Sequence, residues 1–183
     1  EHNAYLVPYD KLIIATGASP VIPNISGLKC KDNVFTVRKI EDGINIREKM
    51  FNSSHATVIG SGYIGMELLE AFVKNGLKVT VIEKNERIMT MFDDEISDMI
   101  KARIESENNG NFEFLTSEIV SEFIGEESVE AVKTLSGKVI KTDMVVICTG
   151  VKANIDIARD AGIEIGTTGA IKVNKVMQTS IQD

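Results

Sequence analysis

Two hydrophobic periods follow one another in residues 57–83. Residues 57–59 form a short β-branched run, whereas the apolar residues of 63–75 recur at the three- and four-residue spacing of a helix. Gly76 is a typical end for such a helix, and residues 78–82 return to the alternation of a strand. The pattern therefore predicts a strand, a helix and a second strand. The helix face expected to point inward carries Ile64, Leu68, Ala71 and Phe72.

Two stretches outside this unit resemble each other. Residues 9–20 and residues 142–154 each combine an acid, an apolar run and Thr-Gly. Such runs suit buried central strands of a parallel sheet, whose carboxyl edge is where open α/β sheets bind ligands. A plain core strand followed by a glycine turn is the alternative for each. A connector with Pro and Gly follows the first stretch, and residues 39–52 then show a polar helical pattern.

The chain after Glu83 alternates between helical and strand patterns. A helix is expected from Asp93 or Asp94 to about Glu107, and residues 112–115 return to strand. Three short alternating pieces then predict an antiparallel meander: residues 119–124, 129–135 and 138–141. The predicted fold class is α/β, a Rossmann-like parallel sheet with an antiparallel three-stranded β-meander crossover. The apolar cluster expected to fill core space is Met89, Met91 and Phe92.

A glycine motif, G-x-G-x-x-G, lies between the first predicted strand and the helix. We expect Gly60 to make the turn, Gly62 to let a diphosphate approach the backbone, and Gly65 to let the helix pack on the strand. The N–H groups of the first helical turn would bind the anion. A glycine-rich turn without a ligand is the alternative. The candidate cofactor-binding residues of this turn are Gly60, Ser61, Gly62, Tyr63, Ile64 and Gly65.

Glu83 ends the second strand, where the dinucleotide motif has an acid for the ribose hydroxyls. A carboxylate about 4 Å from a 2′-phosphate would be repelled by up to about 4 kcal/mol at an effective dielectric of 20. The sequence therefore favours NAD(H) over NADP(H). Lys84, a further candidate contact, and Arg87 could each turn toward a phosphate, and a solvated strand end is the alternative role for Glu83.

Composition limits the remaining possibilities. The 183 residues, 43% of them hydrophobic, suffice for one domain with pieces of another, and the net charge of −7 disfavours nucleic-acid binding. No apolar run approaches the length of a membrane span, so we expect a soluble, cytoplasmic protein. Cys30 and Cys148 are far apart, as are His2 and His55, so no disulfide framework and no metal site are expected.

The order of these motifs resembles the pyridine nucleotide-disulfide oxidoreductases, flavoproteins with two dinucleotide-binding domains. Some stretches look most like the NADH oxidase, NADH peroxidase and coenzyme A disulfide reductase branch. The resemblance implies that residues 21–150 are the NAD(H)-binding domain, that residues 1–20 are a remnant of the FAD domain with a hinge, and that residues 151–183 return toward the FAD domain. The matching stretches are LIIATGASPVIP, TVIGSGYIGMELLEAFVKNGLKVTVIE, FDDEI, DMVVICTGVKAN and TSIQD.

The resemblance also implies roles for single residues. Tyr63 would cover the flavin and move aside for nicotinamide, Glu67 would lie beside both rings, and Gly150 would line the nicotinamide side. The family's redox cysteine precedes the ATG segment, and no cysteine stands before Lys11. We therefore expect a fragment without a catalytic residue of its own, which binds NADH but lacks the FAD and dimerisation domains of its parent enzyme.

Two other functions were weighed against this one. A non-catalytic NAD(P)H-binding module stays open as an alternative. A short-chain dehydrogenase is disfavoured because its Tyr-x-x-x-Lys pair is missing. The residues four positions after the three tyrosines are Tyr9, Ile13 and Glu67.

Overall fold

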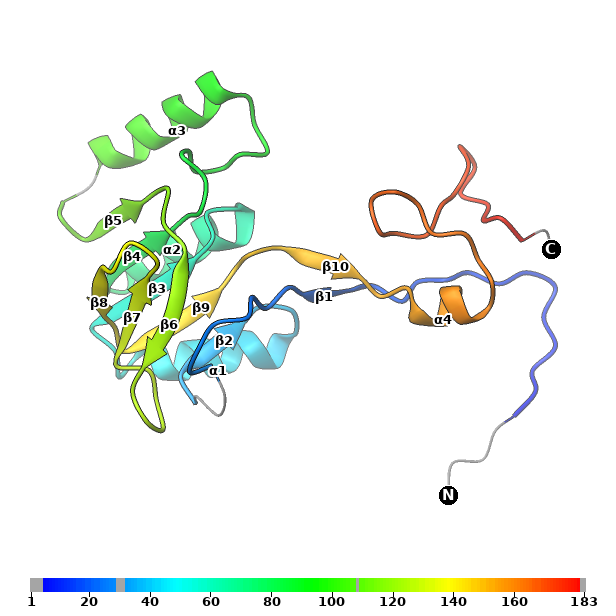
Figure 1. Ribbon diagram of the computed structural model, residues 1–183, viewed down its shortest axis with the longest axis horizontal. Helices are drawn as coiled ribbons and strands as arrows, with labels where there is room; N and C mark the ends of the chain where they lie inside the picture. Colours follow the sequence, from blue (N-terminus) through cyan, green and yellow to red (C-terminus); the bar gives the residue numbers. More distant parts are fainter. Residues whose placement is uncertain (1–4, 29–31, 108, 182–183) are drawn as a thin grey trace. The chain divides into compact units, whose positions relative to one another are not determined.

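The computed structural model describes residues 5–28, 32–107 and 109–181. The chain forms two compact units (Figure 1). The larger runs from Pro20 to Gly150, and the smaller joins the segment that ends at Ser19 with the segment that starts at Val151. All the elements from β2 to β9 belong to the larger unit.

A five-stranded sheet forms the centre of the larger unit. Its strand order is β2-β9-β3-β4-β5, and every neighbouring pair is parallel. The predicted strands at 57–59, 78–82 and 112–115 are confirmed, as is the buried central strand within 142–154. The strands are β2 (Val34–Thr36), β3 (His55–Ile59), β4 (Lys78–Ile82), β5 (Phe112–Leu115) and β9 (Met144–Ile147).

Helices cover one face of this sheet. Side chains of α1 (Ile40–Met50) and α2 (Tyr63–Lys74) pack on strand residues such as Val58 and Val81. Side chains alternate between the two faces of each strand, and both faces of this sheet are covered by other elements. The strands therefore carry nearly unbroken apolar runs. A third helix, α3 (Asp94–Ser106), connects β4 to β5. Helices were expected at all three places.

The inward face of α2 agrees with the predicted one in part. Phe72 is buried and Leu68 packs partly buried against the core, as predicted, whereas Ile64 is 43% exposed and Ala71 is exposed. Gly65 and Leu69 are buried in place of these two. The physical reason is that the helix touches the preceding strand at Gly65, the one residue of the first turn without a side chain, and this contact sets the rotation of the helix.

An antiparallel meander covers the other face of the sheet. Its strands are β6 (Val120–Ile124), β7 (Ala131–Thr134) and β8 (Val139–Lys141), in that order. Val120, Phe123 and Val132 pack against Ile59, Ile82 and Ile147 in a second core. The predicted meander and the predicted fold class are both confirmed. The larger unit is therefore a three-layer structure of helices, parallel sheet and meander (Figure 1).

The smaller unit contains β1 (Ala18–Pro20), paired with β10 (Val151–Ala153), and the short helix α4 (Asp156–Asp160). The prediction of a buried central strand in residues 9–20 is wrong. Leu12 is 62% and Ile13 89% exposed, and regular strand starts only at Ala18. A buried strand needs a neighbour on each side, and among the described residues only β10 pairs with this segment.

Asn154 ties together the two chain segments of the smaller unit. Its amide donates to the carbonyl of Thr16 at 3.0 Å, and its side-chain oxygen accepts from the Ser19 hydroxyl at 2.7 Å. Its backbone N–H donates to the carbonyl of Gly17 at 2.9 Å. The two Thr-Gly stretches thus have different roles. Thr149-Gly150 follows the core strand β9, whereas Thr16-Gly17 lies in the exposed segment that Asn154 binds.

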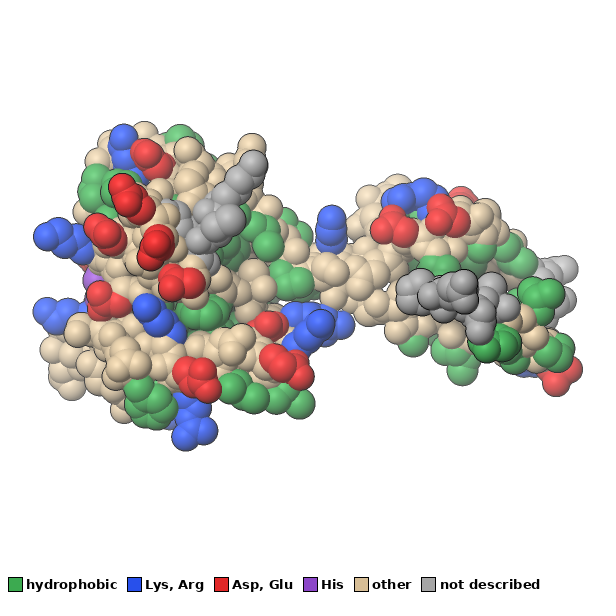
Figure 2. Space-filling view, turned by 90° about the horizontal axis from the view of Figure 1, so that it is seen from below, with side chains coloured by type: hydrophobic (Ala, Val, Ile, Leu, Met, Phe, Trp, Pro, Cys, Tyr) green, Lys and Arg blue, Asp and Glu red, His purple; other side chains and the backbone are tan. Residues whose placement is uncertain are grey.

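Charged side chains of both signs are interspersed over the face of the larger unit that Figure 2 shows. None of the helices that the structure describes combines the length and hydrophobicity that crossing a membrane requires. Within the described ranges, no three His, Cys, Asp or Glu side chains come together as a metal site requires. Cys30 and His2, which the expected absence of a disulfide framework and of a metal site involves, lie outside the described residues.

Candidate functional site

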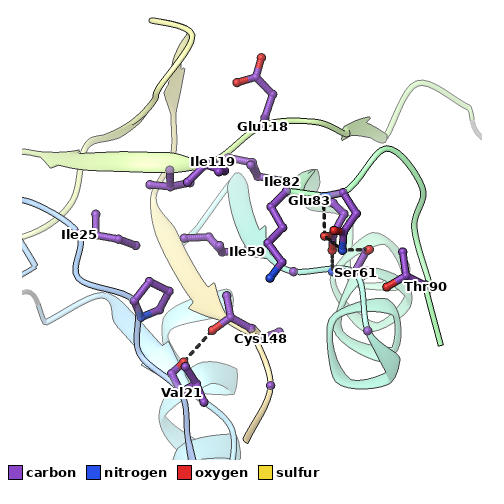
Figure 3. Close-up of a pocket in the computed structure, with 18 residues that line it drawn as sticks. Val21, Ile25, Ile59, Ser61, Ile82, Glu83, Thr90, Glu118, Ile119 and Cys148 are labelled. Carbon is purple, nitrogen blue, oxygen red and sulfur yellow. Dashed lines mark hydrogen bonds between the residues drawn. The ribbon is translucent and has the colours of Figure 1, made fainter.

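A cavity of about 550 Å³ lies in the larger unit at the carboxyl ends of β3, β4 and β9. The glycine turn forms one wall and the start of the meander forms another (Figure 3). Six of the residues predicted from the sequence line it: Gly60, Ser61, Gly62, Glu83, Lys84 and Gly150. Tyr63, Ile64, Gly65 and Glu67 are not among the lining residues. The cavity is therefore where the sequence placed a ligand, at the carboxyl edge of a parallel sheet.

Two glycines of the motif are required by the protein itself. Gly60 has φ +101°, and a Cβ there would lie 2.5 Å from the carbonyl oxygen of Cys148. A Cβ on Gly65 would overlap the carbonyl oxygen of Gly60. Both atoms belong to the backbone and cannot move aside cheaply. Gly60 and Gly65 are therefore explained by the fold alone.

Gly62 is different because nothing in the protein demands a glycine there. Its φ is −73°, an ordinary value, and the atom nearest to an added Cβ would be Cε of Met91 at 3.7 Å. That distance is a normal van der Waals contact. A glycine that neither backbone conformation nor packing requires fits a site where a ligand approaches the main chain closely.

The amide groups beside Gly62 form a set of donors suited to an anion. Gly62 is the N-cap residue of α2 and has no side chain to cap the helix. The carbonyl of Gly62 accepts from the N–H of Met66 at 3.0 Å, which starts the helical bond pattern. The N–H groups of the first turn have no partner within a helix, so they point toward the end at which the cavity lies.

Glu83 lies at the end of β4 and is only 8% exposed. Its Oε2 accepts the backbone N–H of Ser61 at 2.9 Å and the Ser61 hydroxyl at 2.7 Å. Its Oε1 accepts the backbone N–H of Asn85 at 3.0 Å and the Asn85 side-chain amide at 2.9 Å. Figure 3 shows the carboxylate held against Ser61 at the side of the cavity. Glu83 thus lines the cavity, and its oxygens already have protein donors.

One wall of the cavity is apolar, and the sequence analysis did not identify it. Ile25, Ile59, Ile82 and Ile119 converge there in Figure 3. Ile25 comes from the connector, which is attached to the meander through Ser26, whose carbonyl accepts from the N–H of Phe123 at 2.8 Å. The alternation in 119–124 was the only available signal, and it predicted a strand without indicating what that strand would face.

Glu118 was also missed. It is 7% exposed, and its carboxylate accepts from the Ser136 hydroxyl at 2.8 Å and forms an ion pair with Lys138 at 3.0 Å. The hydrogen bond from Lys138, followed by that from Ser136, lowers the pKa of Glu118. In Figure 3 the carboxylate points away from the other labelled side chains. Glu118 therefore stabilises the wall of the cavity and does not face its interior.

Cys148 and Thr149 line the side of the cavity near Gly150. The Thr149 hydroxyl donates to the carbonyl of Val21 at 2.7 Å, and the Val21 N–H donates to the carbonyl of Gly150 at 2.9 Å. Burial raises the pKa of the Cys148 thiol to about 12. A thiol with that pKa carries almost no thiolate at neutral pH and is a poor nucleophile.

Tyr63, Ile64 and Glu67 lie on the exposed surface of α2. The Tyr63 ring meets the Phe92 ring edge to face with a centroid distance of 5.9 Å. Met91 and Phe92 are 47% and 37% exposed, so the predicted core role of the Met89, Met91 and Phe92 cluster is wrong for these two and right for Met89. The exposed pair instead forms an apolar edge beside the glycine turn.

Comparisons with known proteins identify the architecture. The whole chain, residues 1–183, matches the pyridine nucleotide-disulphide oxidoreductase family. It is 40% identical over 178 residues to the NAD(P)H sulfur oxidoreductase (CoA-dependent) of Pyrococcus abyssi, and this match covers 96% of the chain and 39% of the relative. The chain thus spans about two fifths of the length of that relative.

Two solved structures have closely similar folds. One is an NAD-dependent persulfide reductase from A. fulgidus, with a TM-score of 0.87 and 34% identity over 94% of this chain and 32% of that one. The other is the water-forming NADH oxidase of Lactobacillus brevis bound to NADH, with a TM-score of 0.83 and 28% identity over 94% of this chain and 37% of that one. The family resemblance predicted from the sequence is confirmed.

Proposed function

Because the chain belongs to the pyridine nucleotide-disulphide oxidoreductase family, we propose that residues 21–150 form its NAD(H)-binding domain. The diphosphate of NADH lies on the amides at the start of α2, against Gly62. The observation that carries this proposal is that neither the φ of Gly62 nor its packing calls for a glycine. A diphosphate at the helix N-terminus supplies the missing reason.

The two ends of NADH fit the two ends of the cavity. The adenosine lies toward Glu83 and the apolar wall that contains Ile82 and Ile119, and the nicotinamide lies toward Gly150. An apolar wall suits an aromatic base, because it removes the faces of the ring from water. The amides at Tyr63 and Ile64 bind and orient the diphosphate between them.

We propose NADH, and not NADPH, as the preferred nucleotide. Glu83 lines the cavity, and a carboxylate beside the adenosine ribose would repel a 2′-phosphate. Of the cations that could offset it, Arg87 is engaged elsewhere, because its guanidinium pairs with Asp94 at 3.3 Å and Asp98 at 3.0 Å. The exposed Lys84 lines the cavity and is the nearest alternative partner for a phosphate.

The family uses FAD together with NAD(P)H, and NADH supplies the hydride that FAD accepts. In this chain we assign Tyr63 to covering the flavin and Glu67 to the neighbourhood of the nicotinamide and flavin. Both side chains are exposed on α2, and their i, i+4 spacing puts them on the same face of the helix. No side chain of this chain is assigned a bond-breaking role, and the redox cysteine is expected in another part of the longer enzyme.

The smaller unit is proposed to belong to the FAD domain of a longer protein. Its exposed apolar side chains, Leu12 and Ile13 among them, suit strands that a fuller domain would cover. The 39% coverage of the Pyrococcus abyssi relative agrees with this proposal. We therefore propose that the isolated chain binds NADH without turnover, as a binding module does.

Calorimetric titration of NADH into the chain and into its Gly62→Ala variant tests the binding site. The wild-type chain should bind NADH, and Gly62→Ala should weaken binding at least tenfold, because the methyl group occupies the position of the diphosphate. Gly43→Ala is the matched control, since Gly43 also has free space around it and lies in α1. Equal affinity of the wild-type chain and Gly62→Ala would refute the placement of the diphosphate.

A second measurement separates the binding module from an active fragment. The absorbance spectrum of the purified chain should lack flavin bands. NADH should be oxidised no faster with the chain than in buffer without protein. Bound FAD that is bleached by NADH would show that the chain holds both cofactors and would contradict the proposed inactivity.

A further inference from the structure

The carboxylate of Glu83 is held by four donors that come from only two residues. Ser61 supplies its backbone N–H and its hydroxyl to Oε2, and Asn85 supplies its backbone N–H and its side-chain amide to Oε1, all at 2.7–3.0 Å. A carboxylate has about four lone-pair positions, so these bonds fill them. All three residues line the cavity.

This arrangement limits what Glu83 can do for a nucleotide. The four hydrogen bonds leave the negative charge of the carboxylate in place, so it still repels a phosphate. A free glutamate side chain could rotate away from that phosphate, because it has three flexible torsions. The four hydrogen bonds prevent this rotation.

We propose that Ser61 and Asn85 are positioning residues that determine nucleotide specificity through Glu83. They fix its carboxylate at the cavity wall, where it excludes a ribose 2′-phosphate by repulsion. The inference rests on the proposed function, since it assumes that the adenosine end of the nucleotide faces Glu83.

Mutation can remove the hydrogen bond that the Asn85 side-chain amide donates to Glu83. Asn85→Ala leaves its backbone N–H in place, and Asn85 is only half-buried, so the fold tolerates the change. Without this side-chain hydrogen bond, the Glu83 carboxylate can rotate away from a phosphate. At an effective dielectric of 20, moving two unit charges from about 4 Å to about 6 Å apart changes affinity about tenfold.

The test compares the dissociation constants of NADH and NADPH for the wild-type chain, Asn85→Ala and Ser61→Ala. Both variants should bind NADPH more tightly, about tenfold for Asn85→Ala, while NADH affinity changes less than threefold. Asn75→Ala is the control, because the Asn75 amide donates to the Ala71 carbonyl on the surface of α2 and is not part of the cavity. Its NADPH-to-NADH ratio should equal that of the wild-type chain.

A double-mutant cycle shows whether the effect acts through Glu83. In a Glu83→Ala background, Asn85→Ala should produce no further change in the NADPH-to-NADH ratio. An equal loss of both affinities in Asn85→Ala would assign Asn85 a purely structural role and overturn the proposal. A selective loss of NADH affinity would also overturn it, because Glu83 would then act mainly as a ribose acceptor.

The controls separate this inference from the proposed function. A wild-type chain that binds neither nucleotide refutes the NADH site itself and, with it, the inference built on that site. A wild-type chain that binds NADH, with Asn85→Ala showing an unchanged ratio, refutes only the role of Asn85 and Ser61.

Discussion

The carbonyl oxygen of Gly60 occupies the space that a side chain on Gly65 would need. The end of β3 and the first turn of α2 therefore touch through their backbones. This contact brings the helix N-terminus to the carboxyl edge of the sheet, beside the cavity. It also sets the rotation of α2, so that Leu69 and Phe72 face the core.

Substitution of two motif glycines, Gly65 and Gly62, should separate fold from ligand binding. Gly65→Ala should destabilise the chain by about 1–3 kcal/mol, because the backbone must shift to admit the methyl group. Gly62→Ala should change the free energy of unfolding by less than about 0.5 kcal/mol, since the new Cβ has ordinary contacts. Urea unfolding followed by circular dichroism measures both. Equal destabilisation by the two substitutions would contradict the assignment.

Asn33 should be among the most sensitive polar positions. It is 1% exposed, and its amide donates to the carbonyls of Val129 and Asp143, both at 2.8 Å, while its oxygen accepts the Val129 N–H at 2.7 Å. Asn33→Ala leaves these buried groups without partners and should cost about 2–4 kcal/mol in urea unfolding. Asn52→Ala, at an exposed position, should stay within about 0.5 kcal/mol of the wild type.

His55 should make stability depend on pH. Its Nε2 lies 2.9 Å from the Thr80 hydroxyl, whose own proton goes to Glu113, so the imidazole donates. Burial is the main cause that lowers the pKa of His55 from 6.5, and the charges of Asp143 and Glu113 oppose it. Because the unfolded chain then binds a proton more readily, the free energy of unfolding falls as the pH drops below about 6.5.

His55→Gln should remove this part of the pH dependence. Urea unfolding of both proteins at pH 7.5 and pH 5 gives the comparison, and the stability of the wild type relative to the variant should decrease at pH 5. Carboxylates such as Glu118 titrate in both proteins, so their contribution cancels in the difference. A relative stability that is constant or increases at pH 5 would show that His55 is not disfavoured in its charged form.

Cys148 should resist thiol reagents in the folded chain. A pKa raised from 9.0 to about 12 reduces its thiolate fraction at neutral pH roughly a thousandfold. The measurement uses a Cys30→Ser background, so that Cys148 is the remaining cysteine. Labelling with iodoacetamide should be slow in buffer and fast in urea. Rapid labelling of the folded chain would indicate an accessible thiolate instead.

Local patterns predicted most elements of the larger unit, because each strand and helix there carries the period of its own structure. The failure at residues 9–20 shows the limit of this approach. Leu12 and Ile13 have the composition of a buried strand, yet a strand is defined by its neighbours, and the described residues of this segment have too few. The same limit explains the wrong prediction for Met91 and Phe92. Their apolar character did not indicate whether they would lie in the core or on the surface.

The site was partly predictable for a related reason. Gly60, Gly62 and Glu83 stand at fixed spacings around one strand–helix–strand unit, so local sequence placed them together. Ile25, Ile119 and Asn85 line the same cavity but belong to no short motif. The positions of Ile25 and Ile119 depend on how the connector and the meander pack on the sheet, which no local spacing encodes. Asn85 follows Glu83 by two residues and is held by its carboxylate.

The sequence by itself determined the unit of strand, glycine turn, helix and acid, because hydrophobic period and glycine spacing act over a few residues. Only the tertiary structure decided that Gly62 is free of internal constraint, that Glu83 is held by Ser61 and Asn85, and that the meander closes the apolar wall. The hydrogen bonds between Ser61 and Glu83 and the packing of the meander on the sheet join residues far apart in the chain, so their geometry is fixed only when the layers have packed.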